Sequence, residues 1–242
     1  VGVNTDHILV DFKNPTGVSL IIVDNKGVPE FVQMIGASEP ILPEEIREEY
    51  IQKARHLHMS GINSEALLHA SKIARESGVT VSLDSGRKKS ELGLKKLKPI
   101  LKNVDILIIN RHEAKVMLGL EDNTKILDVA KNLRKKIGED KTYIIKGGKE
   151  NILMYSPNGD FLVSSFKVTV KDTIGAGDAF DAGFLAATLR GKTLKDAVVY
   201  GGACGSLKCM QEGAQCAPDK STLETFLKEN EDKIELWNLR KS

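Results

Sequence analysis

Residues 170–184, VKDTIGAGDAFDAGF, combine a glycine-rich turn with a predicted helix that carries a carboxylate in its first turn. Gly175, Ala176 and Gly177 leave the backbone open to a ligand, and the first N–H groups of a helix have no partner inside the helix. Together with the helix dipole, these groups favour a bound anion. Asp178 belongs to the same turn. A carboxylate beside an anion cradle predicts phosphoryl transfer, in which positioning and charge stabilisation provide most of the catalysis.

Asp178 has two interpretations on the residues alone. A carboxylate in the first turn of a helix is a common cap, because it accepts hydrogen bonds from the free N–H groups. Alternatively, Asp178 is a general base that takes the proton from an acceptor hydroxyl, a poor nucleophile at neutral pH, as this hydroxyl attacks a phosphorus atom. The N–H groups of residues 176–178 would then stabilise charge on the transferring group.

Two motifs give the chain a family resemblance. Residues 172–178, DTIGAGD, resemble the DTxGAGD signature of the PfkB, or ribokinase-like, carbohydrate kinases, and residues 110–113, NRHE, match the NxxE motif of that family. The similarity follows the family's order and spacing from about residue 1 to about residue 230. It implies an ATP-dependent kinase that phosphorylates a sugar hydroxyl. Asp178 would be the catalytic base in contact with the substrate, and residues 175–178 the anion hole.

Asn110 and Glu113 are three residues apart, on one face of a predicted first helical turn. An N-cap Asn with Glu at the third helical position is a variant of the capping box, which has no catalytic role. The resemblance implies that the same pair helps to place Mg²⁺ and the ATP phosphates, usually through water. A hard divalent cation suits such oxygen ligands. The two interpretations are compatible.

The resemblance also implies two further nucleotide contacts. Lys146 and Gly148 belong to a loop, KGGKEN, that would lie against the phosphates and ribose of ATP, although a plain turn between strands has the same composition. Residues 201–218, which include Gly202 and Gly213, resemble the wall of the adenine pocket and, in some relatives, of a K⁺ site. Small residues there are equally typical of tight helix packing.

The resemblance also implies that Arg87 and Asp172 contact the substrate. Arg87 ends the segment DSGR, which resembles the family's D-P-G or D-P-N segment, and a guanidinium binds phosphate bidentately; a solvated surface Arg is the alternative. Asp172 is implied to orient substrate, metal or a monovalent cation, and a turn residue is the alternative. Residues 36–38, GAS, before residues 43–45, PEE, resemble the GAN-then-helix segment of ribokinases and favour a ribose-like or keto-sugar substrate.

Alternating helices and strands must position these residues. The pattern predicts helices over 43–55, 64–77, 91–102, 124–137 and 177–190, and strands over 56–59, 79–84, 106–109, 143–145, 151–155 and 160–165. Such alternation indicates βαβ units and a three-layer αβα sandwich with a mainly parallel sheet. Ligands of open α/β sheets bind at the carboxyl ends of the strands. Four polar residues are expected at such ends: Asp84, Asn110, Lys146 and Asp172.

Residues 18–34 have the pattern of two strands around the turn Asp24-Asn25-Lys26-Gly27 and predict a hairpin that serves as a lid. We expect residues 1–40 to form lid elements and the entry to the core, and residues 41–242 to form the nucleotide-binding and catalytic core. The apolar strand at 18–23 could join two copies in a homodimer. Family members begin with a strand bearing a substrate-binding Asp and a GG-containing segment. Neither is found, so we expect the chain to lack these first strands.

Composition narrows the function classes. The net charge of +2, from 35 Lys and Arg against 33 Asp and Glu, gives no electrostatic reason to expect a nucleic-acid partner. Three cysteines without CxxC spacing predict neither a disulfide framework nor a zinc site and favour a reduced, cytoplasmic setting. No apolar run approaches the roughly 20 residues that cross a bilayer. His56 and His58 alternate on a predicted strand with no carboxylate partner nearby in the sequence, so we predict structural roles for both.

Two other functions stay open on the sequence. A nucleoside kinase of the same superfamily shares the catalytic end but stacks a base in its pocket, and the aromatic content of 5% argues against such stacking. A non-catalytic nucleotide-binding homologue would keep the phosphate turn, and the first strands that the chain is expected to lack leave this alternative open. It predicts nucleotide binding without turnover.

Overall fold

Two sheets and a set of helices form the part of the chain that the computed structural model describes, residues 2–23, 29–38, 41–61 and 64–239. The strands are β1 (Val18–Val23), β2 (Pro29–Met34), β3 (His56–Met59), β4 (Thr80–Asp84), β5 (Ile106–Asn110), β6 (Thr142–Lys146), β7 (Ile152–Ser156), β8 (Gly159–Val163) and β9 (Leu236–Asn238). The helices are α1 (Glu48–Gln52), α2 (Ser64–Glu76), α3 (Gly86–Ser90), α4 (Gly93–Leu101), α5 (Arg111–Leu118), α6 (Ile126–Ile137), α7 (Ala176–Leu189), α8 (Leu194–Cys209) and α9 (Lys220–Glu229). Among these described helices, none is long and apolar enough to cross a membrane.

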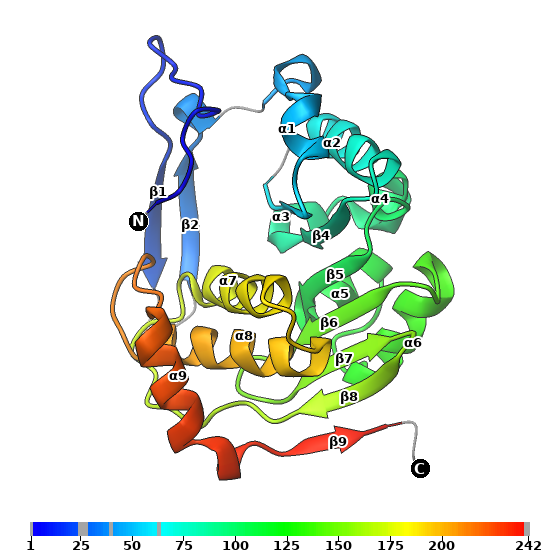
Figure 1. Ribbon diagram of the computed structural model, residues 1–242, viewed down its shortest axis with the longest axis vertical. Helices are drawn as coiled ribbons and strands as arrows, with labels where there is room; N and C mark the ends of the chain where they lie inside the picture. The colour runs from blue at the N-terminus through cyan, green and yellow to red at the C-terminus, as the bar shows by residue number, and fades with distance from the viewer. Residues whose placement is uncertain (1, 24–28, 39–40, 62–63, 240–242) are drawn as a thin grey trace.

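The larger sheet has seven strands in the order β3-β4-β5-β6-β7-β8-β9. Strands β3 to β6 pair in parallel, as the alternation of helices and strands predicts. Strand β7 is antiparallel to β6 and β8 is antiparallel to β7, so β8 runs in the same direction as β3 to β6. Strand β9 adds an antiparallel edge. Helices α7 and α8 cover one face, and α2, α4, α5 and α6 cover the other (Figure 1). The predicted three-layer sandwich with a mainly parallel sheet is confirmed.

Strand β5 shows why a continuous apolar run suits this sheet. Side chains alternate between the two faces of a strand, and both faces are covered by helices. Ile106 and Ile108 pack in the core beneath α7 and α8, whereas Leu107 and Ile109 pack in the core beneath α2, α4, α5 and α6. All four side chains are buried.

Three of the four polar residues expected at the carboxyl ends of strands lie there. Asp84, Asn110 and Lys146 are the last residues of β4, β5 and β6, and Asn110 is paired directly with Lys146 in the parallel register. The prediction for Asp172 is wrong, because residues 164–172 are described and form no strand. The β-branched residues before Asp172 lie beside no strand with which they could form a hydrogen-bonded ladder, so their strand propensity alone does not produce a strand.

Other elements differ from the sequence prediction. The predicted helix at 43–55 is a 3₁₀ turn over Pro43–Glu45 followed by the five-residue α1. Helices α8 and α9 and strand β9 were not predicted. Helix α8 lacks a one-sided apolar stripe because glycine, alanine and cysteine fill its centre, so periodicity gives no signal for it.

Strands β1 and β2 form a separate antiparallel hairpin, which stands beside the larger sheet as a blue ribbon in Figure 1. The predicted turn at residues 24–27 lies outside the described residues. Since directly paired residues point to the same face of a hairpin, one face carries only apolar residues apart from Glu30. These apolar residues are Val18, Leu20, Ile22, Val32 and Met34, with exposed fractions of 55%, 59%, 52%, 59% and 57%. Phe31 and Gln33, on the other face, line the cavity described next.

Candidate active site

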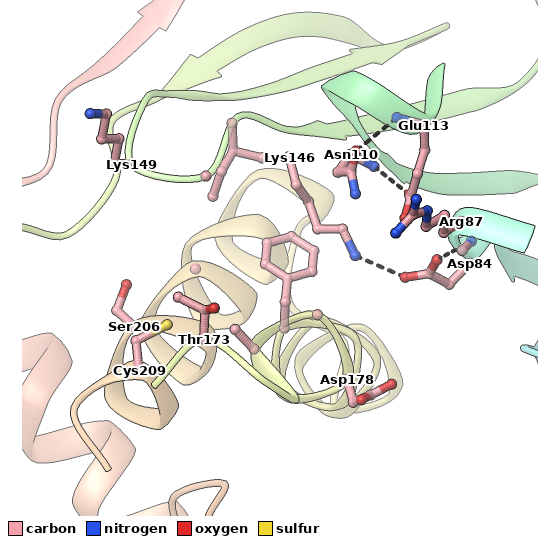
Figure 2. A pocket seen from close by; sticks show the side chains of 18 of the residues that line it. Asp84, Arg87, Asn110, Glu113, Lys146, Lys149, Thr173, Asp178, Ser206 and Cys209 are labelled. Atoms are coloured by element: carbon pink, nitrogen blue, oxygen red, sulfur yellow. Dashed lines mark hydrogen bonds and ion pairs between the residues drawn. The ribbon is translucent and has the colours of Figure 1, made fainter. Parts of the chain in front are cut away.

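A cavity of about 1850 Å³ opens at the carboxyl edge of the parallel strands, between the start of α7, the end of α8 and the hairpin. It is lined by most of the residues that the sequence analysis selected, which are Arg87, Asn110, Glu113, Lys146, Gly148, Ala176, Gly177, Asp178 and Gly202. Figure 2 shows how the labelled side chains from β4, β5, β6, α5 and α7 surround it. The residues that come together here are separated by as many as 115 positions along the chain, from Arg87 to Gly202.

Gly175 shapes the predicted anion cradle. It precedes α7 with a left-handed φ of +82°, and a Cβ atom at this position would lie 2.4 Å from the carbonyl oxygen of Ala214. Only glycine meets both requirements without strain. The N–H of Ala176 donates to the Thr173 carbonyl at 3.1 Å. This bond removes Ala176 from the predicted set of free donors, whereas the N–H groups of Gly177 and Asp178 have no partner in the described chain.

Asp178 is exposed and lines the cavity. Its carboxylate makes no cap hydrogen bond to α7, and within the described residues it has no ion-pair partner. The capping interpretation of Asp178 therefore has no support in the geometry. A carboxylate with all its lone pairs available, in the same turn as two free N–H donors, is arranged to accept a proton from a bound molecule.

Asn110 and Glu113 form a capping box at the start of α5. The Asn110 Oδ1 accepts from the Glu113 N–H at 2.8 Å, and the Glu113 Oε2 accepts from the Asn110 N–H at 3.1 Å. Burial raises the pKa of Glu113. The box uses Asn110 Oδ1 and Glu113 Oε2, and among the described residues Glu113 Oε1 has no partner, so it could coordinate a metal ion. One such donor fits a Mg²⁺ ion held mainly by water and nucleotide phosphates. The described residues contain no cluster of three or more His, Cys, Asp or Glu side chains that would hold a metal alone.

Lys146 lies at the centre of a buried charge network. Its Nζ is 2.8 Å from Asp84 Oδ2 and 3.6 Å from Asp181 Oδ1, and it lies over the Phe180 ring at 5.5 Å from the centroid. Burial disfavours the charged form of Lys146, but the attraction of Asp84 and Asp181 outweighs it and raises the Lys146 pKa. Burial likewise works against ionised Asp84, yet Lys146 keeps the Asp84 pKa below its ordinary value.

Asp181 is a site residue that the sequence analysis missed. Burial raises its pKa to about 8; Lys146 opposes this shift and Asp84 adds to it. Its Oδ2 lies 3.6 Å from the Nε2 of His58, and the His58 Nδ1 lies 2.8 Å from Ser82 Oγ. His58 has no carboxylate partner in its local sequence, but β3 and α7 meet in the fold and bring Asp181 to it. The one sequence signal that could have identified Asp181 is its position three residues after Asp178, which places both carboxylates on neighbouring positions of the α7 surface.

Asp172 and Gly213 shape the turn instead of lining the cavity. The Asp172 carboxylate accepts from the N–H groups of Ile174 and Gly213 at 2.9 and 3.0 Å, and it lies 3.4 Å from the Nζ of Lys208. Lys208 is fully buried near the end of α8. These contacts tie the glycine-rich turn to the end of α8. They match the alternative interpretation of Asp172 as a turn residue.

Residues 201–218 were interpreted either as a wall of the nucleotide pocket or as a site of tight helix packing, and the glycines of α8 support both interpretations. Gly202 lines the cavity, and a Cβ there would lie 3.1 Å from Ile152 Cδ1. Gly201 and Gly205 face α7, where a Cβ would approach the carbonyl oxygens of Phe180 at 2.9 Å and Ala176 at 3.1 Å, and Gly205 also lines the cavity. The small residues thus both border the cavity and let α7 and α8 pack closely.

Arg87 and Gly148 lie at the rim of the cavity. Arg87, on α3, is exposed and pairs with Glu91 one helical turn later, with Nε and Oε1 at 3.3 Å. Gly148 follows β6 with a left-handed φ of +67°, and its carbonyl accepts from Ser165 Oγ at 3.0 Å. Both are accessible to a ligand in the cavity.

Comparison with known proteins places the chain among carbohydrate kinases. Residues 1–220 match the model of the pfkB family of carbohydrate kinases. The ATP-dependent ribose-1-phosphate kinase of Halopiger xanaduensis is 32% identical over 231 residues, which cover 96% of this chain and 74% of that protein. The crystal structure of ribokinase from Thermotoga maritima has a TM-score of 0.76 and 25% identity, and the match covers 89% of this chain and 70% of that one. A putative ribokinase II from E. coli, in complex with ATP and Mg²⁺, has the same fold, with a TM-score of 0.77, 22% identity, and coverage of 90% and 72%.

Proposed function

This chain belongs to the pfkB family and is an ATP-dependent carbohydrate kinase; from that premise we propose that Asp178 is the general base that activates a hydroxyl of a ribose-like or keto-sugar substrate. The observation that carries the proposal is the exposed, unpaired Asp178 carboxylate in the same helical turn as two unpaired N–H groups. Base and anion donors are then presented to one point in the cavity. That arrangement suits transfer of a phosphoryl group to an alcohol.

In this mechanism Asp178 takes the proton of the acceptor hydroxyl as its oxygen attacks the γ-phosphorus of ATP. The N–H groups of Gly177 and Asp178 donate to the oxygens on which charge develops. Gly175 and Ala176 hold the turn in shape, through the left-handed φ of Gly175 and the Ala176–Thr173 hydrogen bond. Transfer leaves ADP, and Asp178 returns its proton to solvent at the exposed mouth of the site.

We assign the nucleotide to the part of the cavity between β6 and α8. Lys146 would contact the phosphates, and Gly148 and Gly202 leave room for the ribose and base. Asn110 and Glu113 would hold Mg²⁺ through water, with Glu113 Oε1 as the available protein oxygen. When bound, the metal neutralises phosphate charge. Gly213 and Asp172 contribute indirectly, because their hydrogen bond supports the turn.

A second acceptor class is favoured by the basic residues of α3. Arg87 and Lys88 are both exposed at the cavity. A guanidinium binds a phosphate group more strongly than a neutral hydroxyl. The Halopiger xanaduensis relative is described as a ribose-1-phosphate kinase. An acceptor that already carries a phosphate, held at Arg87, is therefore the second candidate, beside free pentoses and keto-sugars.

The test is formation of ADP from Mg-ATP in the presence of ribose, ribose 1-phosphate, keto-sugars, hexoses, keto-deoxy acids or nucleosides, with Asp178→Asn as the control. Acceptor-dependent ADP formation that the variant lacks would support the proposal and name the acceptor class. A preference for ribose 1-phosphate over ribose would favour the second candidate, and turnover only with nucleosides would indicate a nucleoside kinase. ATP binding with no turnover on any acceptor would contradict the proposal.

A further inference from the structure

Asp181 holds a buried carboxyl group whose place in the proposed reaction is not explained by the base, the anion donors or the metal ligands. Its side chain is 7% exposed. Within the described chain its Oδ1 accepts no hydrogen bond, and the cation nearest to that oxygen is the Lys146 ammonium at 3.6 Å. Buried polar atoms are normally hydrogen-bonded, so an oxygen that lacks a donor needs an explanation.

Lys146 lies where the carboxyl network meets the anion cradle. A Cβ atom at Gly177 would lie 3.5 Å from the Lys146 Nζ, which places the ammonium beside the first turn of α7. The same Nζ is shared between Asp84 and Asp181, at 2.8 and 3.6 Å. Figure 2 shows the Lys146 side chain extending toward Asp84 within the cavity. A phosphate bound at the cradle would therefore compete with two carboxylates for one cation.

The charge of Asp181 decides the outcome of this competition. If both carboxylates are ionised, Asp84, Lys146 and Asp181 together carry one negative charge, and phosphate is repelled. If Asp181 is protonated, the three groups sum to zero, and the ammonium has a single carboxylate partner. The charged and titratable groups that face Asp181 or Lys146 are His58 of β3, Asp84 of β4, Glu113 of α5 and Asp178 of α7.

We propose that Asp181 is a positioning residue whose proton controls how far the Lys146 ammonium is available to the phosphates of ATP. Protonated Asp181 leaves Lys146 free to turn toward the nucleotide, whereas ionised Asp181 draws Lys146 away and adds negative charge beneath the cradle. This inference rests on the proposed nucleotide site, because it needs phosphate near Lys146.

The protonation states fit this role near neutral pH. Burial raises the pKa of Asp181 to about 8, so the group changes charge between about pH 7 and pH 9. Burial lowers the pKa of His58, which places the titration of this neighbour on the acid side of that range. The expected pH dependence therefore belongs to Asp181 and not to the histidine beside it.

Calorimetric titration of the protein with Mg-ATP, without acceptor, from pH 6.5 to pH 9 tests the proposal. For the unchanged protein we expect the Kd to rise between pH 7 and pH 9 by up to about tenfold, because a group with a pKa of about 8 is about nine-tenths protonated at pH 7 and about one-tenth protonated at pH 9. Asp181→Asn should bind with a Kd close to the pH 7 value throughout. Asp128→Asn, an exposed change on α6, is the matched control and should keep the rise.

A second measurement keeps the test decisive if Asp181→Asn folds poorly. Because ATP would favour the protonated form, binding at pH 8 to 8.5 should take up a fraction of a proton, seen as a buffer-dependent heat. Lys146→Met should abolish both effects. Equal pH slopes in the unchanged protein and Asp181→Asn, or binding without proton uptake, would overturn the inference. Failure of the proposed function would look different, as ATP binding without acceptor-dependent ADP formation.

Discussion

At the residue scale, Asp178 and Asp181 are separated by less than one turn of α7 but meet opposite surroundings. Asp178 is exposed in the cavity and unpaired, whereas Asp181 is buried between Lys146 and His58. The first environment leaves a carboxylate free to accept a hydrogen bond from a substrate hydroxyl, whereas burial in the second favours the protonated form of Asp181. Two carboxylates of one helix therefore have different roles because of their neighbours.

Asp178→Asn should abolish phosphoryl transfer while preserving nucleotide binding. Asparagine keeps the size of the side chain but cannot accept the hydroxyl proton, and loss of a general base typically costs about 10² to 10⁴ in rate. We expect kcat to fall by that factor and the Kd for Mg-ATP to change by less than about threefold, measured by ADP formation and calorimetry. Turnover near that of the unchanged protein would remove Asp178 from the mechanism.

Asp181→Asn should alter how stability depends on pH. The ordinary pKa of an aspartate is 3.8, and that of Asp181 in the folded protein is raised to about 8. Between these values the folded state binds a proton that the unfolded state has released, so the free energy of unfolding falls as pH rises. One proton gives a slope of up to about 1.4 kcal/mol per pH unit.

The comparison of the two proteins isolates this contribution. Asparagine does not titrate, so Asp181→Asn should become progressively more stable relative to the unchanged protein from pH 5 to pH 8, with no further divergence well above pH 8. Urea unfolding at pH 5, 6, 7 and 8 measures the difference. Parallel stability curves for the two proteins would show that Asp181 ionises normally in the folded state.

Residue-level prediction succeeded where the signal was local. Asp178 follows a glycine turn and Asn110 precedes Glu113 by three residues, so short motifs drew attention to them, and the family resemblance of those motifs supplied their functional interpretation. Asp181 was missed because its partners come from β3, β4 and β6, and no short sequence window contains them. The prediction that the Ala176 N–H is a free donor was wrong, because this group donates to the Thr173 carbonyl in a turn that the sequence alone does not reveal.

At the element scale, Gly175 joins the start of α7 to the loop at Ala214. Gly175→Ala combines a left-handed φ of +82° with a Cβ only 2.4 Å from a backbone oxygen. We expect a loss of more than about 2 kcal/mol in the free energy of unfolding, because the backbone must shift in addition to bearing the conformational cost. The displaced cradle should also lose most of its affinity for Mg-ATP.

Gly191→Ala is the matched control for this change. Gly191 follows α7 with a similar φ of +79°, but among the described residues beyond its two chain neighbours no atom lies within 4 Å of its added Cβ. It should lose only the conformational cost of a left-handed alanine, about 1 to 2 kcal/mol, and retain nucleotide binding. Chemical unfolding and calorimetry on both variants make the comparison. Equal losses of stability, or normal ATP binding by Gly175→Ala, would show that the contact with Ala214 does not hold the cradle.

Elements were predictable where burial and periodicity agreed. The run ILII of β5 is apolar on both faces because helices cover both, and it was located correctly. Helix α8 was missed because its central glycines, which allow close packing against α7, have low helix propensity and so weaken the helical signal in the sequence. The strand expected before Asp172 is absent because propensity without a neighbouring strand is insufficient.

At the scale of the whole molecule, the layered core and the β1–β2 hairpin have different degrees of burial. The core elements bury apolar residues on both faces of the sheet, as the alternating pattern predicted. The hairpin leaves the apolar face of Val18, Leu20 and Ile22 more than half exposed. The alternating pattern of residues 18–34 predicted the hairpin itself. It did not predict which face of the hairpin lies toward the cavity, because that depends on contacts with residues far away in the sequence.

The apolar face of the hairpin should be covered by a second copy of the chain. A two-stranded hairpin is marginally stable alone, and exposed apolar patches of this kind mark interaction surfaces. Leu20 and Val32 are directly paired at the centre of the face, with exposed fractions of 59% each. We expect a homodimer in which two such faces pack together, detected by size-exclusion chromatography with light scattering.

Leu20→Lys should convert this dimer to a monomer, since it places one charge from each copy at the centre of a symmetric interface. Leu127→Lys, the same change at a 41% exposed leucine of α6, should remain dimeric and so controls for added charge. Because Phe31 and Gln33 of the same hairpin line the cavity, the monomeric variant should also bind acceptor more weakly, as a raised KM for the acceptor. A monomeric unchanged protein, or a dimeric Leu20→Lys variant, would show that the hairpin face is not the interface.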